Sequence, residues 1–210
     1  MLIRTVEFAG AVASPGAPTP GNLAQIAFAG RSNVGKSSLI NRLLGRTRTV
    51  VARVSATPGK TQEINFYRTS VRLGSGDDRD FFVVDLPGYG FARVPLSVRG
   101  AWRPLVESYL SGTPELAGVV QLVDMRHDPT SEDLQLLEYL AELGIPTLVV
   151  LTKADKLRAS ARSRQQEQML IQLGLPDEQV IAFSARTGEG RESLLDGIEA
   201  LLAGASDEPD

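Results

Sequence analysis

The stretch Gly30-Arg-Ser-Asn-Val-Gly-Lys-Ser37 has the glycine, lysine and serine spacing of a phosphate-binding loop. An apolar run, Ala24–Ala29, precedes it, and the residues after Ser37 carry apolar side chains at helical spacing. In such a strand, loop and helix, successive backbone N–H groups point at phosphate oxygens, and the helix dipole attracts negative charge. Lys36 supplies a positive charge for the β- and γ-phosphates, and the Ser37 hydroxyl suits a magnesium ion. The stretch therefore predicts a nucleotide site in an α/β fold.

Further apolar runs alternate with helical patterns along the chain. The runs are Phe81–Val84, Val119–Val123, Thr147–Leu151 and Val180–Phe183, and Ser131–Leu143 has the apolar spacing of a helix. Strands that are apolar on both faces belong in a parallel sheet covered by helices. This alternation predicts a doubly wound, mostly parallel sheet with helices on both faces and with ligands at the carboxyl ends of the strands.

One segment does not fit the parallel pattern. Ile64–Val71 can pair with Asp80–Asp85 through the turn Gly74-Ser-Gly-Asp-Asp78. We therefore predict that Ile64–Val71 is an antiparallel strand at one edge of the sheet.

Composition limits the number of domains and the location of the protein. The 210 residues are 42% hydrophobic, which suffices for one core, and the chain has no cysteine and so no disulfide. We expect an N-terminal arm over residues 1–22, a nucleotide-binding domain over 23–203 and a flexible acidic tail over 204–210. No apolar run approaches the roughly 20 residues of a membrane span, and no secretory signal is recognisable. We therefore expect a cytoplasmic monomer without a membrane span.

Two segments are candidates for elements that respond to the terminal phosphate of the nucleotide. Asp85-Leu-Pro-Gly88 follows a buried strand, where the carboxylate can hold a magnesium-bound water and the Gly88 N–H can reach the γ-phosphate. Leu86–Val94 is then a second switch. The first switch is Thr57-Pro-Gly-Lys-Thr61, whose Thr61 hydroxyl can add a magnesium ligand. Each motif alone is typical of an ordinary turn. Together they indicate a nucleotide site because they occur in the expected order after the phosphate-binding loop.

Selection of the base is assigned to Thr152-Lys-Ala-Asp155, at the end of another apolar run. The Asp155 carboxylate can accept hydrogen bonds from the ring N–H and the exocyclic amine of guanine, whereas adenine would leave it buried and unpaired. The stem of Lys153 can lie over the base. Ser184-Ala-Arg186 can present backbone N–H groups to the guanine carbonyl. GTP and GDP are therefore the predicted ligands, together with Mg²⁺.

The complete set of candidate site residues follows from these motifs. The nucleotide-contacting residues are predicted to be Gly30, Arg31, Ser32, Asn33, Val34, Gly35, Lys36, Ser37, Ser38, Gly59, Lys60, Thr61, Asp85, Gly88, Thr152, Lys153, Asp155, Ser184, Ala185 and Arg186. The predicted metal ligands are Ser37, Thr61 and, through water, Asp85. Residues predicted to act in hydrolysis are Lys36, Thr61, Gly88 and Asn33.

These motifs resemble the EngB family, also called YihA or YsxC. The resemblance is carried by Gly30–Asn41, Thr57–Gln62, Asp85-Leu-Pro-Gly-Tyr-Gly90 and Thr152-Lys-Ala-Asp-Lys156. It implies a magnesium-dependent GTPase that acts in late assembly of the large ribosomal subunit, with ribosomal RNA and ribosomal proteins as partners. The family is also described as needed for the division septum. Thr152 stands where most GTPases have asparagine, and the EngB pattern shares this threonine.

Hydrolysis is expected to be slow. Tyr89 follows Gly88 where many GTPases have a glutamine that orients the attacking water, so turnover near ~10⁻⁴ to 10⁻³ s⁻¹ is expected without an activator. Asn33 offers an alternative, because its similarity to potassium-activated relatives suggests that its amide oxygen helps to hold a K⁺ beside the phosphates. A side-chain hydrogen bond that shapes the loop is an equally good explanation for Asn33.

Charge does not decide the partner. The net charge of −3 gives no general argument for binding nucleic acid, although Arg42–Lys60 contains five basic residues and no acid. This stretch is either an RNA-facing patch or a solvated face. The alternative function that remains open is a GTP-dependent protein-binding switch in cell division that does not contact RNA.

Overall fold

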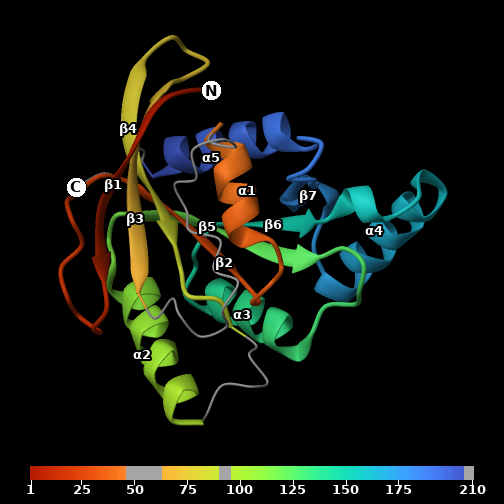
Figure 1. The fold of residues 1–210 in the computed structure, drawn as a ribbon, viewed down its shortest axis with the longest axis horizontal. Coiled ribbons are helices and arrows are strands. Elements are labelled where there is room, and N and C mark those ends of the chain that lie inside the picture. The colour runs from red at the N-terminus through yellow and green to blue at the C-terminus, as the bar shows by residue number, and fades with distance from the viewer. Residues whose placement is uncertain (46–62, 90–95, 206–210) are drawn as a thin grey trace.

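The chain forms a seven-stranded sheet covered by helices in a computed structural model that describes residues 1–45, 63–89 and 96–205 (Figure 1). In chain order the elements are β1 (Leu2–Val12), β2 (Gln25–Gly30), α1 (Lys36–Leu43), β3 (Ile64–Arg72), β4 (Asp78–Asp85), α2 (Leu96–Gly112), β5 (Leu116–Asp124), α3 (Ser131–Glu142), β6 (Thr147–Thr152), the 3-10 turn η1 (Ala154–Lys156), α4 (Ala159–Leu173), the 3-10 turn η2 (Asp177–Gln179), β7 (Val180–Ala182) and α5 (Arg191–Gly204). Among these described helices, every one is too short or too polar to cross a lipid bilayer.

The strand order is β1-β3-β4-β2-β5-β6-β7, and the sheet is parallel from β4 to β7. The predicted α/β class is confirmed. The predicted antiparallel pairing of Ile64–Val71 with the following strand is also confirmed, since Thr69 lies opposite Phe81. The edge position was wrong, because β1 pairs antiparallel with the other side of β3 and forms the edge itself.

The N-terminal segment therefore needs a correction. Residues 2–12 of the expected arm are a strand of the sheet, and residues 13–24 connect it to β2 without helix or strand. The helix α5 extends to Gly204, and residues 206–210 of the expected tail lie outside the described residues. The limits of a separate GTPase domain thus stay a prediction.

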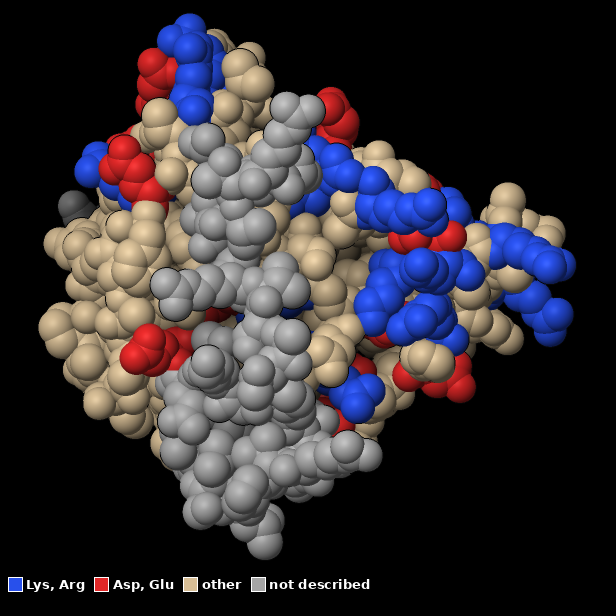
Figure 2. Space-filling model, viewed as in Figure 1, with Lys and Arg blue, Asp and Glu red and all other residues tan. Residues whose placement is uncertain are grey.

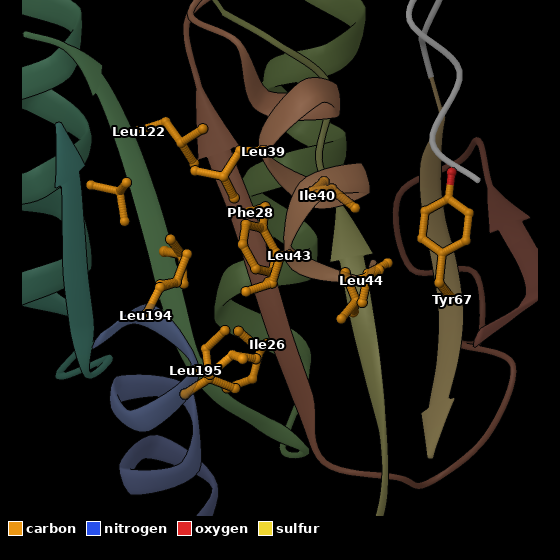
Figure 3. Close-up of a cluster of buried hydrophobic side chains, with 14 of the residues drawn as sticks. Ile26, Phe28, Leu39, Ile40, Leu43, Leu44, Tyr67, Leu122, Leu194 and Leu195 are labelled. Carbon is orange, nitrogen blue, oxygen red and sulfur yellow. The ribbon is translucent and has the colours of Figure 1, made fainter. Parts of the chain in front are cut away.

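Both faces of the sheet are covered by apolar helix faces. On one face, α1 and α5 pack on β2 and β5, and Figure 3 shows Leu39 and Leu43 of α1 beside Phe28, with Leu194 and Leu195 of α5 nearby. On the other face lie α2 and α3, and α4 covers the end of the sheet at β6 and β7. This double cover explains why β2 is buried along its whole length and is apolar or small at every position after Gln25.

The topology decides where a ligand can bind. From β2 the chain goes first to β3 and β4 on one side and later to β5 on the other, so strand order reverses between β2 and β5. In open α/β sheets the crevice at the carboxyl ends of the strands on either side of such a reversal is the usual binding site. The loop after β2 opens into that crevice.

Candidate nucleotide-binding site

The phosphate loop runs from the end of β2 at Gly30 to the start of α1 at Lys36. The loop is closed by a hydrogen bond from the Val34 N–H to the Arg31 carbonyl (3.1 Å), and the Gly35 carbonyl accepts from the Leu39 N–H (2.8 Å). Gly35, the residue before the helix, has φ +107°, a conformation that glycine adopts without strain. These features place the N-terminus of α1 at the crevice, as the sequence predicts.

The segment after β4 is joined to this loop through its backbone. The Ser32 N–H donates to the Tyr89 carbonyl (2.9 Å), and the Tyr89 N–H donates to the Gly30 carbonyl (3.3 Å). Gly88 lies so close that a Cβ there would stand 2.9 Å from Ser32 Oγ and 3.3 Å from the Ser32 nitrogen. Only glycine leaves this space free. The backbone at Gly88 and Tyr89 therefore cannot move away without breaking its contacts with Gly30 and Ser32 of the phosphate loop.

Lys36 and Asp85 meet in an ion pair at the carboxyl end of the sheet. Their side chains are 11% and 7% exposed, so both charges are largely withdrawn from water. Ser37 follows Lys36 in the first turn of α1 and brings a hydroxyl to the same end of the sheet. A hydroxyl and a carboxylate are oxygen ligands of the kind that Mg²⁺ takes together with phosphates. The described residues contain no group of three or more acidic, histidine or cysteine side chains that could hold a metal by themselves.

A cavity of about 550 Å³ extends from the phosphate loop along α1. Its lining comes from three segments that are distant in sequence: Val34, Gly35, Ser38, Leu39, Asn41, Arg42, Thr152, Lys153, Asp155, Lys156, Phe183, Ala185 and Arg186. This volume lies in the usual range for a small-molecule site. The cavity thus joins the predicted phosphate loop to the predicted base motif.

Asp155 has one oxygen bound and one oxygen free. Its Oδ1 accepts a hydrogen bond from Ser184 Oγ (2.8 Å), which fixes the carboxylate. Its Oδ2 is buried and has no hydrogen-bond partner among the described residues. A buried charged acceptor without a donor is costly, and a ligand with adjacent N–H groups relieves that cost. Guanine has two such N–H groups on one edge, whereas adenine has a ring acceptor there, so guanine fits this site.

Thr152 and Lys153 tie the base motif to the phosphate loop. Thr152 Oγ1 donates to the Val34 carbonyl (2.7 Å), which gives the threonine of this motif a structural role. Lys153 Nζ donates to the Asn33 carbonyl (2.7 Å) and to Asp124 Oδ2 (2.8 Å), so its stem runs beside the cavity. Burial alone would raise the pKa of Asp124, but hydrogen bonds from Arg126 and Lys153 outweigh it and hold that pKa well below its ordinary value. The Asp124 carboxylate therefore stays charged and keeps Lys153 in place.

The side chain of Tyr89 is bound at the start of α3. Its hydroxyl donates to Asp133 Oδ1 (2.9 Å) at the start of α3, and the residue is only 6% exposed. Burial, together with the negative charge of Asp133, raises the pKa of Tyr89 far above its ordinary value, so the hydroxyl stays protonated. The same carboxylate caps α3 with Thr130. Tyr89 thus anchors the Gly88 segment to α3 and does not orient a water.

The other predicted residues divide into three groups. Asn33 is exposed with φ +65°, and its side chain makes no hydrogen bond to the described part of the chain. Gly59, Lys60 and Thr61, and most of the second switch, lie outside the described residues. In the predicted segment Ser184-Ala-Arg186, the Ser184 N–H donates to the Glu189 carbonyl (3.0 Å), and Ala185 and Arg186 line the cavity.

Some contributions to the site were not predictable from the motifs. Arg42, counted in the basic stretch, donates to the Ala185 carbonyl (2.6 Å) and the Arg186 carbonyl (2.5 Å), so it holds the base loop and is not a free surface charge. Arg191 donates to the carbonyl of Leu43 (2.8 Å), the last residue of α1, and so caps the C-terminus of that helix. No local sequence signal marks either role, because both partners lie more than a hundred residues away.

The fold and this arrangement of phosphate loop and base pocket define a P-loop GTP-binding protein. A family model described as "50S ribosome-binding GTPase" matches residues 25–153. A probable GTP-binding protein EngB from Gemmatimonas aurantiaca is 46% identical over 97% of this chain and 95% of its own length. One from Syntrophus aciditrophicus is 48% identical over 94% and 95%. The chain therefore belongs to the EngB family of GTP-binding proteins.

Solved structures show the same fold. A probable GTP-binding protein EngB has a TM-score of 0.65 and 28% identity, over 86% of this chain and 100% of that one. Era, in a complex with MgGDPNP and a piece of 16S ribosomal RNA, has a TM-score of 0.68 and 21% identity, over 86% of this chain and 57% of that one. The likeness to Era concerns the fold alone.

Proposed function

We propose that the chain is a magnesium-dependent GTPase that controls assembly of the large ribosomal subunit in the cytoplasm. The observation that carries the nucleotide part is Asp155, whose Oδ2 is buried beside the cavity without a partner. Asp155 selects guanine, Ser184 orients Asp155, and the backbone of Ala185 and Arg186 faces the base carbonyl. The stem of Lys153 lies along the base.

The phosphate end of the site has a corresponding division of roles. The backbone of residues 30–38 binds the phosphates, and Lys36 leaves its ion pair with Asp85 to neutralise them. Ser37, Thr61 and, through a water, Asp85 would hold Mg²⁺, which would neutralise further charge on the β- and γ-phosphates. In the GTP-bound protein, we expect Gly59 and Lys60 of the first switch to contact the nucleotide as well. The N–H of Gly88 binds the γ-phosphate. The presence of this phosphate thereby affects the position of the segment that Tyr89 anchors on α3.

Stimulation by potassium is part of the proposal. The side chain of Asn33 is exposed at the phosphate loop and is not used to shape that loop, which leaves its oxygen available to a cation. We expect single-turnover hydrolysis to be faster in K⁺ than in Na⁺, with Asn33→Ala removing the difference. Equal rates in the two salts would exclude this role.

The ribosomal part is supported by the description of the matching family as ribosome-binding. It predicts that the purified protein sediments with large ribosomal subunits when loaded with a non-hydrolysable GTP analogue, and much less when loaded with GDP. Small subunits in the same gradient are the control. If the protein sediments with large subunits in neither state although it binds GTP, the assembly role is wrong and a protein-binding switch in cell division stands in its place.

A further inference from the structure

Basic side chains gather beside the mouth of the base pocket. Residues 156–166, which run from η1 into the first half of α4, contain four basic residues and no acidic residue. Lys156, Arg158 and Arg164 are exposed, and so is Arg186 on the loop after β7. Lys156 and Arg186 line one cavity, so the two segments meet there. Figure 2 shows the blue side chains gathered over this part of the molecule, where Figure 1 places α4 and β7. We name Lys156, Arg158, Arg164 and Arg186 the basic rim.

The charges of the basic rim are not used by the fold. None of the four side chains has an ion pair or hydrogen bond with another of the described residues. Arg162 differs, because it binds Glu189 (2.5 Å) and thereby joins α4 to the loop that carries Arg186. Arg158 is the N-cap residue of α4 and stands at the positive end of the helix dipole, where a cation does not stabilise the helix. The first turn of α4 contains no acidic residue that could offset its charge. These charges therefore have no evident structural purpose.

The chemistry of the rim indicates what it binds. Three of its four members are arginines, whose planar guanidinium groups bind phosphate through two parallel hydrogen bonds. The residues between Arg158 and Arg164, apart from Arg162, are only Ala and Ser, so no large apolar side chain stands between these two arginines to anchor a membrane or a protein interface. We propose that the basic rim binds the phosphate backbone of RNA, independently of base sequence.

The choice of RNA among polyanions rests on the proposed function. The location of the contact rests on the exposed, unpaired side chains of the basic rim. The basic stretch Arg42–Lys60 was the only RNA-facing candidate in the sequence, and within it Arg42 is committed to the base loop. The rim lies instead on η1, α4 and the loop after β7. Lys156 directly follows Asp155, and Arg186 belongs to the base loop itself, so RNA bound here would lie next to the nucleotide.

The test uses the double variant R158Q/R164Q of the full chain, loaded with GDP, with R4Q/R103Q as the matched control. Neither Arg158 nor Arg164 lines the base pocket, and the control removes the same charge from exposed arginines of β1 and α2. Binding of a fluorescently labelled RNA hairpin is measured by anisotropy over a series of KCl concentrations. Loss of two phosphate contacts should reduce the slope of log K against log salt by roughly 1.4–1.8, and affinity at 0.1 M salt by on the order of tenfold. The control should leave both within error of the wild type.

Each outcome decides the proposal. Equal weakening by the two variants, no weakening by R158Q/R164Q, or no RNA binding by the wild type at low salt would overturn it. Polyglutamate competing as well as unlabelled RNA would also overturn it, since the rim would then be a general anion surface. Retained binding of fluorescent GDP shows that each variant is folded. Failure of large-subunit sedimentation with intact RNA binding at the rim would contradict the proposed function alone.

Discussion

Asp155→Asn is expected to lower the affinity for GDP by about 10²- to 10⁴-fold, because two hydrogen bonds to a charged acceptor, each worth about 1.5–3 kcal/mol, are lost or weakened. The amide oxygen still accepts from the ring N–H, but the amide NH₂ now faces the exocyclic amine of guanine, donor against donor. Xanthine has a carbonyl in the place of that amine and restores the match. Xanthosine diphosphate should therefore bind the variant better than GDP does, and the wild type should show the opposite order.

The measurement is a titration of fluorescent GDP and XDP against both proteins. Asp196→Asn, which changes an exposed carboxylate of α5, is the control and should behave as the wild type. The variant should be folded, since the Asn side chain can keep the hydrogen bond from Ser184 and carries no buried charge. A D155N protein that retains the nucleotide preference of the wild type would remove Asp155 from base recognition.

Lys36→Ala should have two separable effects. It removes the charge that neutralises the β- and γ-phosphates, so affinity for GTP should fall by on the order of 10²-fold or more. It also leaves Asp85 largely buried without its partner, which should lower the free energy of unfolding of the nucleotide-free protein by about 3 kcal/mol. Urea unfolding and nucleotide titration measure the two effects independently.

The double variant K36A/D85N separates the effects. Without the carboxylate there is no unpaired charge, so stability should return to within about 1 kcal/mol of the wild type. Nucleotide affinity should not return, because the lysine charge is still missing. If the double variant recovered GTP binding as well, the loss in K36A would be a consequence of folding and not of a missing phosphate contact.

The central part of the sheet was predictable because its information is local. In β2, apart from Gln25, and in β6 each residue is apolar or small on both faces, and the polar motif follows directly at the strand end. Asp85 and Asp155 could thus be placed at the carboxyl ends of their strands, on the same side of the molecule, from sequence alone. The helix α3 could be predicted from the apolar spacing in Ser131–Leu143, which the structure gives as Ser131–Glu142.

The remaining features depend on partners that are distant in sequence. β1 alternates irregularly between exposed and half-buried residues, and it exists as a strand because β3 offers it a free edge some sixty residues later. Tyr89 reads as a gap in the catalytic pattern, but its hydroxyl is bound to Asp133, 44 residues further along the chain. Arg42 reads as a surface charge until the base loop, more than 140 residues away, covers it. No local pattern encodes such contacts.

Competition for the base pocket tests the account most directly. Fluorescent GDP bound to the wild-type protein is displaced in turn by GTP, ITP and ATP. Because ITP lacks the exocyclic amine and loses one hydrogen bond to a charged acceptor, it should compete about 10- to 100-fold less well than GTP, and ATP at least about 10³-fold less well. Displacement by ATP at concentrations similar to GTP would contradict the assignment of Asp155 and, with it, the GTP-binding site.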